Sequence, residues 1–93
     1  MDDREKRALG ALAMMVRQFV RENDERGLDS TASSAEEHAI TALAEYGYID
    51  EHISGRIFGR WTDAGRALLE WSYPFSEQNL KPFPMPPKAV VRH

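Results

Sequence analysis

Residues 43–69, LAEYGYIDEHISGRIFGRWTDAGRALL, decide the fold of this 93-residue chain. They read as the end of a helix, a β-hairpin and the start of another helix. Gly47 stands where a helix needs a left-handed terminating residue. Residues 48–53 and 56–62 are rich in strand-forming side chains, and the Ser-Gly pair at 54–55 predicts a tight turn between them. Because a two-stranded hairpin is unstable alone, we expect helices to pack beneath it.

Alternation along the second strand divides its side chains between two faces of the hairpin. We expect Trp61 to anchor the strand to the core and Thr62 or Asp63 to cap the helix that follows. This helix should continue to Ser72. One face of the strand carries Ile57, Gly59 and Trp61, and the other carries Arg56, Phe58 and Arg60.

The first helix is predicted over residues 3–23, since apolar residues recur there at helical spacing. Residues 23–33 are polar and rich in turn formers, so they predict an irregular connector. In this connector Gly27 should end the helix and Leu28 should anchor to the core. The spacing of the first helix is set by Leu9, Ala13, Val16 and Val20.

The second helix is predicted over residues 35–46. Ser34 and Glu37 fit a capping box, in which each side chain accepts a hydrogen bond from a backbone amide at the helix start. The stretch from residue 30 to residue 55 contains five acidic residues and no Lys or Arg. The acidic residues of this stretch are Glu36, Glu37, Glu45, Asp50 and Glu51.

Five prolines after residue 73 predict that the end of the chain forms no long regular helix. Pro-rich segments favour extended or polyproline II conformations. We therefore expect a domain over residues 1–72 and a proline-rich extension over residues 73–93. Pro84, Pro87 and Lys88 form a PxxP spacing followed by a cation, which a polyproline-binding groove could take. The alternative is that the extension lies on its own domain through Tyr73, Phe75, Leu80 and Phe83.

Composition places the chain among ordinary globular proteins, with 42% hydrophobic and 29% charged residues. The net charge of -3 supplies no global attraction for nucleic acid. There are no cysteines, which excludes disulfides and thiolate metal sites and is compatible with a cytoplasmic location. No stretch has the length of a membrane span or the pattern of a signal peptide. The sequence predicts a mainly helical α+β fold with three helices and a two-stranded hairpin.

Within residues 43–69 the chain resembles the winged helix-turn-helix of MarR-type and PadR-type transcription regulators. Leu43, Gly47, Tyr48 and Ile49 match the end of the recognition helix in those families. Arg56 matches the wing, and Trp61, Thr62 and Gly65 match the entry to the next helix, with Trp61 in place of the usual Leu. The resemblance implies that residues 35–46 correspond to a helix that lies in the DNA major groove. Between Gly27 and Ser34 there is little room for the helix that normally precedes it.

Two sets of residues are candidates for contact with DNA. Arg56 and Arg60 flank Phe58 on one strand face, where the arginines could bind phosphates while the ring packs or stacks. The alternative is that the arginines pair with Glu51 and Asp50 across the hairpin. On the second helix, His38 and Thr41 could meet base edges.

The second helix carries three glutamates and no cation, whereas phosphate neutralisation supplies most of the affinity for duplex DNA. The resemblance and the wing arginines Arg56 and Arg60 favour the first hypothesis, a small DNA-binding protein or transcription regulator. The acidic second helix, the missing helix and the net charge support the alternative, a protein-interaction or adaptor module on the same scaffold. Met14 and Met15 beside the apolar stripe of the first helix raise the hypothesis of a homodimer through that helix.

No catalytic or metal site is predicted. The sequence contains no nucleophile elbow and no Gly-rich phosphate loop, and no pair of carboxylates has a persuasive spacing. His38, His52 and His93 are dispersed and have no metal-ligand spacing, so each is expected at the surface. We predict a non-enzymatic protein without a cofactor.

Overall fold

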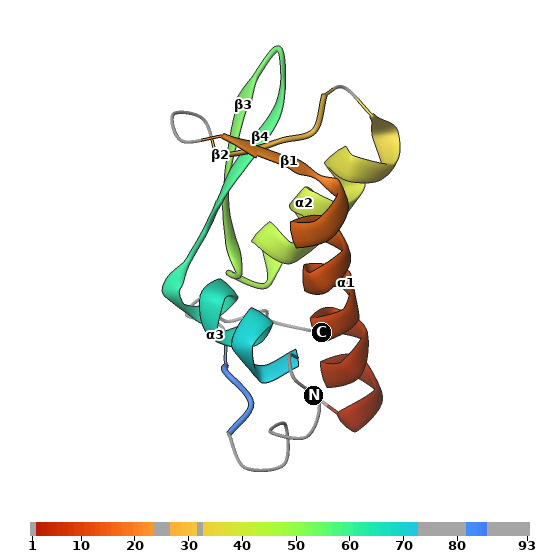
Figure 1. The fold of residues 1–93 in the computed structure, drawn as a ribbon, viewed down its shortest axis with the longest axis vertical. Helices are drawn as coiled ribbons and strands as arrows, with labels where there is room; N and C mark the ends of the chain where they lie inside the picture. The colour runs from red at the N-terminus through yellow and green to blue at the C-terminus, as the bar shows by residue number, and fades with distance from the viewer. Residues whose placement is uncertain (1, 24–26, 32, 73–81, 86–93) are drawn as a thin grey trace, which may run out of the picture.

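Three helices and a four-stranded antiparallel sheet make up the fold of the residues that the computed structural model describes, which are 2–23, 27–31, 33–72 and 82–85 (Figure 1). The fold is therefore α+β and mainly helical. The strand order is β1-β2-β4-β3. The elements in chain order are α1 (Asp3–Phe19), β1 (Arg21–Asn23), β2 (Gly27–Asp29), α2 (Ser34–Glu45), β3 (Ile49–Ser54), β4 (Arg56–Trp61) and α3 (Asp63–Ser72).

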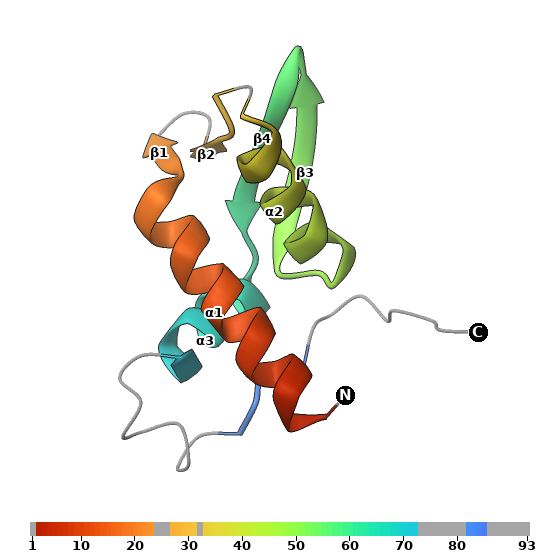
Figure 2. The same cartoon turned by 90° about the vertical axis from the view of Figure 1, so that its right-hand side faces the viewer.

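α1 and α2 lie on one side of the sheet, and α3 lies beyond the end of β4 (Figures 1 and 2). α2 packs against β3 and β4, α3 packs at the end of β4, and α1 crosses α2 and α3. The core lies between the helices and this inner face of the sheet. Its fully buried side chains include Val16, Leu28, Ile40, Leu43, Tyr48, Ile49 and Leu68.

The predicted hairpin is present as β3 and β4, with Gly55 alone between the paired residues Ser54 and Arg56. Trp61 is buried, as expected for a core anchor. Gly47 has a φ of 88° and follows the end of α2, as the sequence predicts. Its carbonyl oxygen accepts a hydrogen bond of 2.8 Å from the Thr62 hydroxyl, which in turn accepts one of 3.0 Å from the amide of Gly65. Thr62 therefore caps α3 and ties its start to the end of α2.

The prediction of an irregular connector was wrong. α1 ends at Phe19, and residues 21–23 and 27–29 form β1 and β2, which extend the hairpin to a four-stranded sheet. Gly27 does not end a helix but begins β2, where its φ is 76°. Leu28 anchors this segment, as expected, because it is fully buried opposite Gly59 of β4.

The start of α2 is shifted by one residue from the prediction. Ser33, not Ser34, is the N-cap, and its hydroxyl accepts from the amide of Glu36 at 3.5 Å. The helix then ends at Glu45 instead of Tyr46. Ser33 and Ser34 are consecutive and offer the same hydroxyl, so the local sequence does not distinguish the two caps.

Part of the extension lies on the domain. Phe83 packs against the hydrophobic core, as expected for one of the four predicted contacts. Tyr73, Phe75 and Leu80 lie outside the described residues. The boundary at residue 73 accordingly stays a prediction.

Candidate interaction surfaces

The outer face of the sheet carries the strand residues predicted to contact DNA. Residues opposite one another in an antiparallel sheet point to the same side. Arg21 is paired with Asp29, Asp29 with Phe58, and Phe58 with His52, so one row crosses all four strands on this face. Among the described residues, α1 and α2 lie on the other side of the sheet and no helix covers this face (Figure 1).

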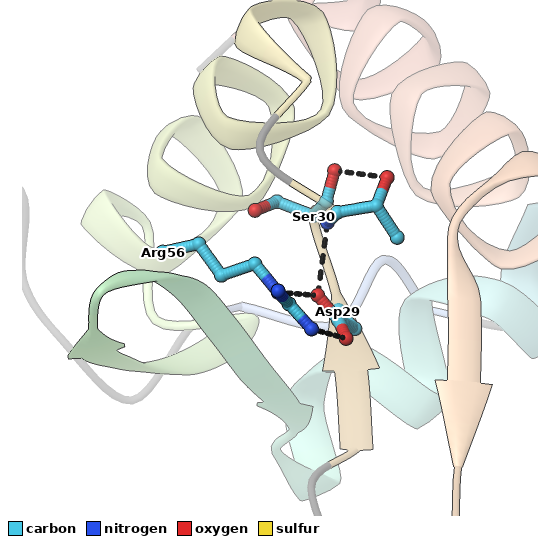
Figure 3. A network of polar contacts seen from close by, with 4 residues as sticks. Asp29, Ser30 and Arg56 are labelled. Atoms are coloured by element: carbon cyan, nitrogen blue, oxygen red, sulfur yellow. Dashed lines mark hydrogen bonds and ion pairs between the residues drawn. The ribbon is translucent and has the colours of Figure 1, made fainter.

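Arg56 is engaged in an ion pair within this face (Figure 3). Its Nε lies 2.7 Å from Oδ1 of Asp29 and its Nη2 lies 2.9 Å from Oδ2. The Asp29 side chain is only 6% exposed, whereas that of Arg56 is 40% exposed. The hydrogen bond to Asp29 and its negative charge raise the pKa of the Arg56 guanidinium. The pairing expected for Arg56 across the hairpin, with Glu51 or Asp50, is therefore replaced by one with β2.

Phe58 is buried although it stands on the outer face. Its exposed fraction is 6%. The guanidinium carbon of Arg56 lies 5.5 Å from the centre of its ring, and the ring of His52 lies 6.3 Å away, centre to centre. Because the ring is buried, it is not presented for stacking on a base.

Arg60 is exposed and lies opposite Asp50 on the neighbouring strand. Together with His52, Ser54 and Phe58 they line a hollow of about 540 Å³ on the sheet. Arg60 thus contributes a cation to the outer face, in a setting that also contains carboxylates.

The two candidate residues of α2 are not equivalent. His38 is exposed. Thr41 is half-buried, and its hydroxyl donates a hydrogen bond to Oε2 of Glu51 on β3. Thr41 therefore links α2 to the inner face of the sheet, on the side opposite to Arg56 and Phe58. The five predicted DNA contacts are consequently divided between two faces.

The sequence missed Asp29, which organises the outer face. Besides Arg56, it accepts a 2.9 Å hydrogen bond from the amide of Thr31, a non-glycine residue with a φ of 54°. An aspartate in a polar connector is ordinarily a turn former. Leu28 was the one residue of the sequence that pointed to this position. Because Leu28 was expected in the core, a strand there would place the next residue, Asp29, on the opposite face of the sheet.

A second surface lies on α1. Ala8, Leu12, Met15 and Phe19 recur at intervals of four, three and four residues, and we call them the α1 stripe. Met15 is 57% exposed and Phe19 is 69% exposed. Leu12 is half-buried and contacts the edge of the core. The adjacent stripe of Leu9, Ala13, Val16 and Val20 is the one that faces the core, as predicted.

No group of three or more His, Asp or Glu side chains in the described residues is arranged to hold a metal ion. His38 and His52 are exposed, and His93 lies outside the described residues. Of the predicted PxxP residues, Pro84 is described and its carbonyl oxygen is bound by Tyr48, whereas Pro87 and Lys88 lie outside.

The described helices differ in length and polarity from membrane spans, since none is long and apolar enough to cross a bilayer.

Between β2 and α2 the described residues form turns and not a helix, so a single helix stands where a helix-turn-helix has two. In comparisons with known proteins, no family model, no curated protein and no solved structure matches this chain.

Proposed function

We propose that this chain is a non-enzymatic protein-interaction module that uses the α1 stripe as a contact surface. The observation that carries the proposal is the exposure of Met15 and Phe19 on one side of a helix whose other side is well packed. Contiguous exposed apolar side chains commonly mark surfaces that bind another protein.

The spacing of the α1 stripe indicates the form of its partner. Intervals of four, three and four residues follow the seam between two packed helices. No residue from Ala8 to Val16 is charged, so a second helix can approach without desolvating a charge there. The partner surface should therefore be a helix with its own apolar stripe.

A second copy of the chain satisfies these conditions. In an antiparallel pair related by a two-fold axis, Ala8 of one copy lies opposite Phe19 of the other, and Leu12 lies opposite Met15. The small side chain then faces the largest one. The seam is about 16 Å long, from eleven residues at 1.5 Å each, so association should be weak and dependent on concentration.

Sedimentation velocity between 10 µM and 1 mM tests the proposal. The unmodified chain should shift from monomer toward dimer, and Phe19→Lys should remain monomeric. Ile53→Lys is the matched control, since Ile53 is equally exposed, at 68%, but lies on the hairpin away from α1. Because the chain lacks cysteine, Ala8→Cys and Phe19→Cys can also be mixed and oxidised. Antiparallel pairing predicts that the mixed disulfide exceeds the half share that random oxidation of an equal mixture gives. A monomer at 1 mM, or identical behaviour of all variants, would refute the dimer.

DNA binding is the second candidate function, on a winged-helix-like scaffold. It is favoured by the succession of α2, the β3–β4 hairpin and α3, and by Arg21, Arg56 and Arg60 on an open sheet face. It is opposed by the pairing of Arg56 and by the acidic α2. We therefore rank DNA binding below the interaction module. For either function we propose a cytoplasmic location.

Fluorescence anisotropy with a mixed-sequence duplex separates the two functions. A DNA-binding protein should lose affinity as the salt concentration rises. A plot of log K against log salt concentration should fall with a slope of about 0.9 for each phosphate contacted. Arg21→Ala with Arg60→Ala should weaken such binding and reduce the slope. The interaction-module proposal expects no binding at 50 mM salt, and salt-dependent binding that needs these arginines would displace it.

A further inference from the structure

Residues 82–85 occupy a contact site at the end of the molecule formed by the start of α1 and by α3 (Figures 1 and 2). Lys6 of α1, Trp71 of α3 and Tyr48, which follows α2, contact this segment. We call these three side chains the Phe83 seat. The segment reads Pro-Phe-Pro-Met, an aromatic residue between two prolines.

The seat holds the aromatic ring from two sides. The rings of Phe83 and Trp71 meet edge to face, with centres 4.9 Å apart and planes at 89°. The ammonium group of Lys6 lies 5.5 Å from the centre of the Phe83 ring. Edge-to-face and cation–π contacts depend on an aromatic ring, so an aliphatic side chain cannot replace both.

The seat also binds the peptide backbone. The Tyr48 hydroxyl donates a 2.9 Å hydrogen bond to the carbonyl oxygen of Pro84. Tyr48 belongs to the buried core, and its ring stacks on Tyr46 at 6.5 Å. A donor fixed in this way can bind a backbone carbonyl of an extended segment, and aromatic-lined grooves recognise extended Pro-rich segments.

Met85, which follows Pro84, lies at a second hollow, of about 520 Å³. The hollow is lined by Met85, Trp61, Thr62 and Arg66, and by the two acidic residues Asp50 and Asp63. Arg66 pairs with Asp63 at 2.9 Å, and Asp50 lies opposite Arg60 on the neighbouring strand. An aliphatic residue such as Met85 therefore suits this hollow.

We propose that the Phe83 seat is a binding site for extended Pro-aromatic-Pro peptides of other proteins, which the chain occupies with its own residues 82–85. The occupying segment itself defines the class of ligand. A tethered segment competes at an effective concentration near the millimolar range, so a free peptide must displace it. The site lies on a different surface from the α1 stripe, and either proposal can fail alone.

The test uses the full chain and a synthetic peptide with the sequence of residues 81–88, KPFPMPPK. Phe83→Ala removes the side chain that fills the seat and should open it, with circular dichroism unchanged. Titration followed by NMR should show the peptide binding Phe83→Ala at least about tenfold more tightly than the unmodified chain. The shifts should centre on the Trp71 indole and on Tyr48.

Three controls define the site. The peptide KPAPMPPK, in which Ala replaces Phe, should not bind. Tyr48→Phe in the Phe83→Ala background should weaken binding about two- to tenfold, as expected for one neutral hydrogen bond. Ile53→Ala in that background should leave the affinity unchanged.

Equal affinity for the unmodified chain and Phe83→Ala would overturn the inference, as would the absence of binding to Phe83→Ala. Shifts confined to Met15 and Phe19 would also overturn it, while supporting the interaction surface on α1.

Discussion

Asp29 and Arg56 are 27 residues apart in the chain and form a bidentate ion pair that joins β2 to the tip of the β3–β4 hairpin. The pair explains why the arginine of the predicted wing belongs to the framework of the sheet. It also fixes the orientation of the segment between β2 and α2, since Asp29 accepts from the amide of Thr31 as well.

Arg56→Lys should lower the thermal stability, because one ammonium group cannot donate to both oxygens of Asp29 in this geometry. Hydrogen exchange of the β2 amides should become faster at the same time. Arg60→Lys, at an exposed position of the same strand, is the matched control and should leave both properties unchanged. Equal effects of the two substitutions would show that the bidentate geometry is unimportant.

Gly65→Ala should destabilise the fold by about 3 kcal/mol or more. A Cβ atom at residue 65 would lie 2.0 Å from the carbonyl oxygen of Tyr48 and 3.0 Å from the Trp61 ring, so the start of α3 must move away from the hairpin. Gly55→Ala is the comparison, because nothing lies within 4 Å of a Cβ there. Its φ of 76° alone should cost about 1–2 kcal/mol. Urea unfolding measures both values, and a smaller loss for Gly65→Ala would contradict the close approach.

Thr62→Ala should cost about 1–2 kcal/mol of unfolding free energy, since its hydroxyl both caps α3 and donates to Gly47. Thr62→Ser keeps the hydroxyl and should retain most of the stability. Arg66→Ala, which removes only an exposed pair with Asp63, should change the free energy by less than about 0.5 kcal/mol. Chemical denaturation of the three variants ranks these effects.

Stability should fall as the pH rises from 10 toward 12 because of Tyr48. Burial, followed by the neighbouring Tyr46, raises the pKa of Tyr48 from 10.0 to about 12. The folded state thus holds the phenol proton more tightly than the unfolded state, so the stabilisation is complete below pH 10 and is lost above it. Denaturant unfolding at pH 8, 10 and 11 should show this decline. Tyr48→Phe should show a smaller one, and equal slopes would refute the assignment.

Local sequence predicted the elements that depend on neighbouring residues. Gly47 ends a helix, Thr62 begins one and Trp61 faces the core, and each of these signals is complete within a few residues. β1 and β2 could not be predicted in this way. Each has three residues. β2 is a strand because Leu28 and Asp29 pair with Gly59 and Phe58, about thirty positions later, and β1 is a strand because it pairs with β2.

The candidate surfaces show the same limit. The sequence placed Phe58 between Arg56 and Arg60 on one face, and the register confirms that arrangement. It could not show that Asp29 neutralises Arg56 or that the Phe58 ring is buried. The α1 stripe was partly visible as surplus apolar residues, but only packing distinguishes Phe19, which is exposed, from Val16, which is buried.

The contact between Lys6 and Phe83 brings the two ends of the described chain together. A peptide linker in place of residues 86–93 could therefore join residue 85 to residue 2, and new ends could be opened at Gly55, where a Cβ atom would have no neighbour within 4 Å. In such a circular permutant β3 and β4 would be the last and first strands of the chain, and the sheet would have to assemble from its two extremes.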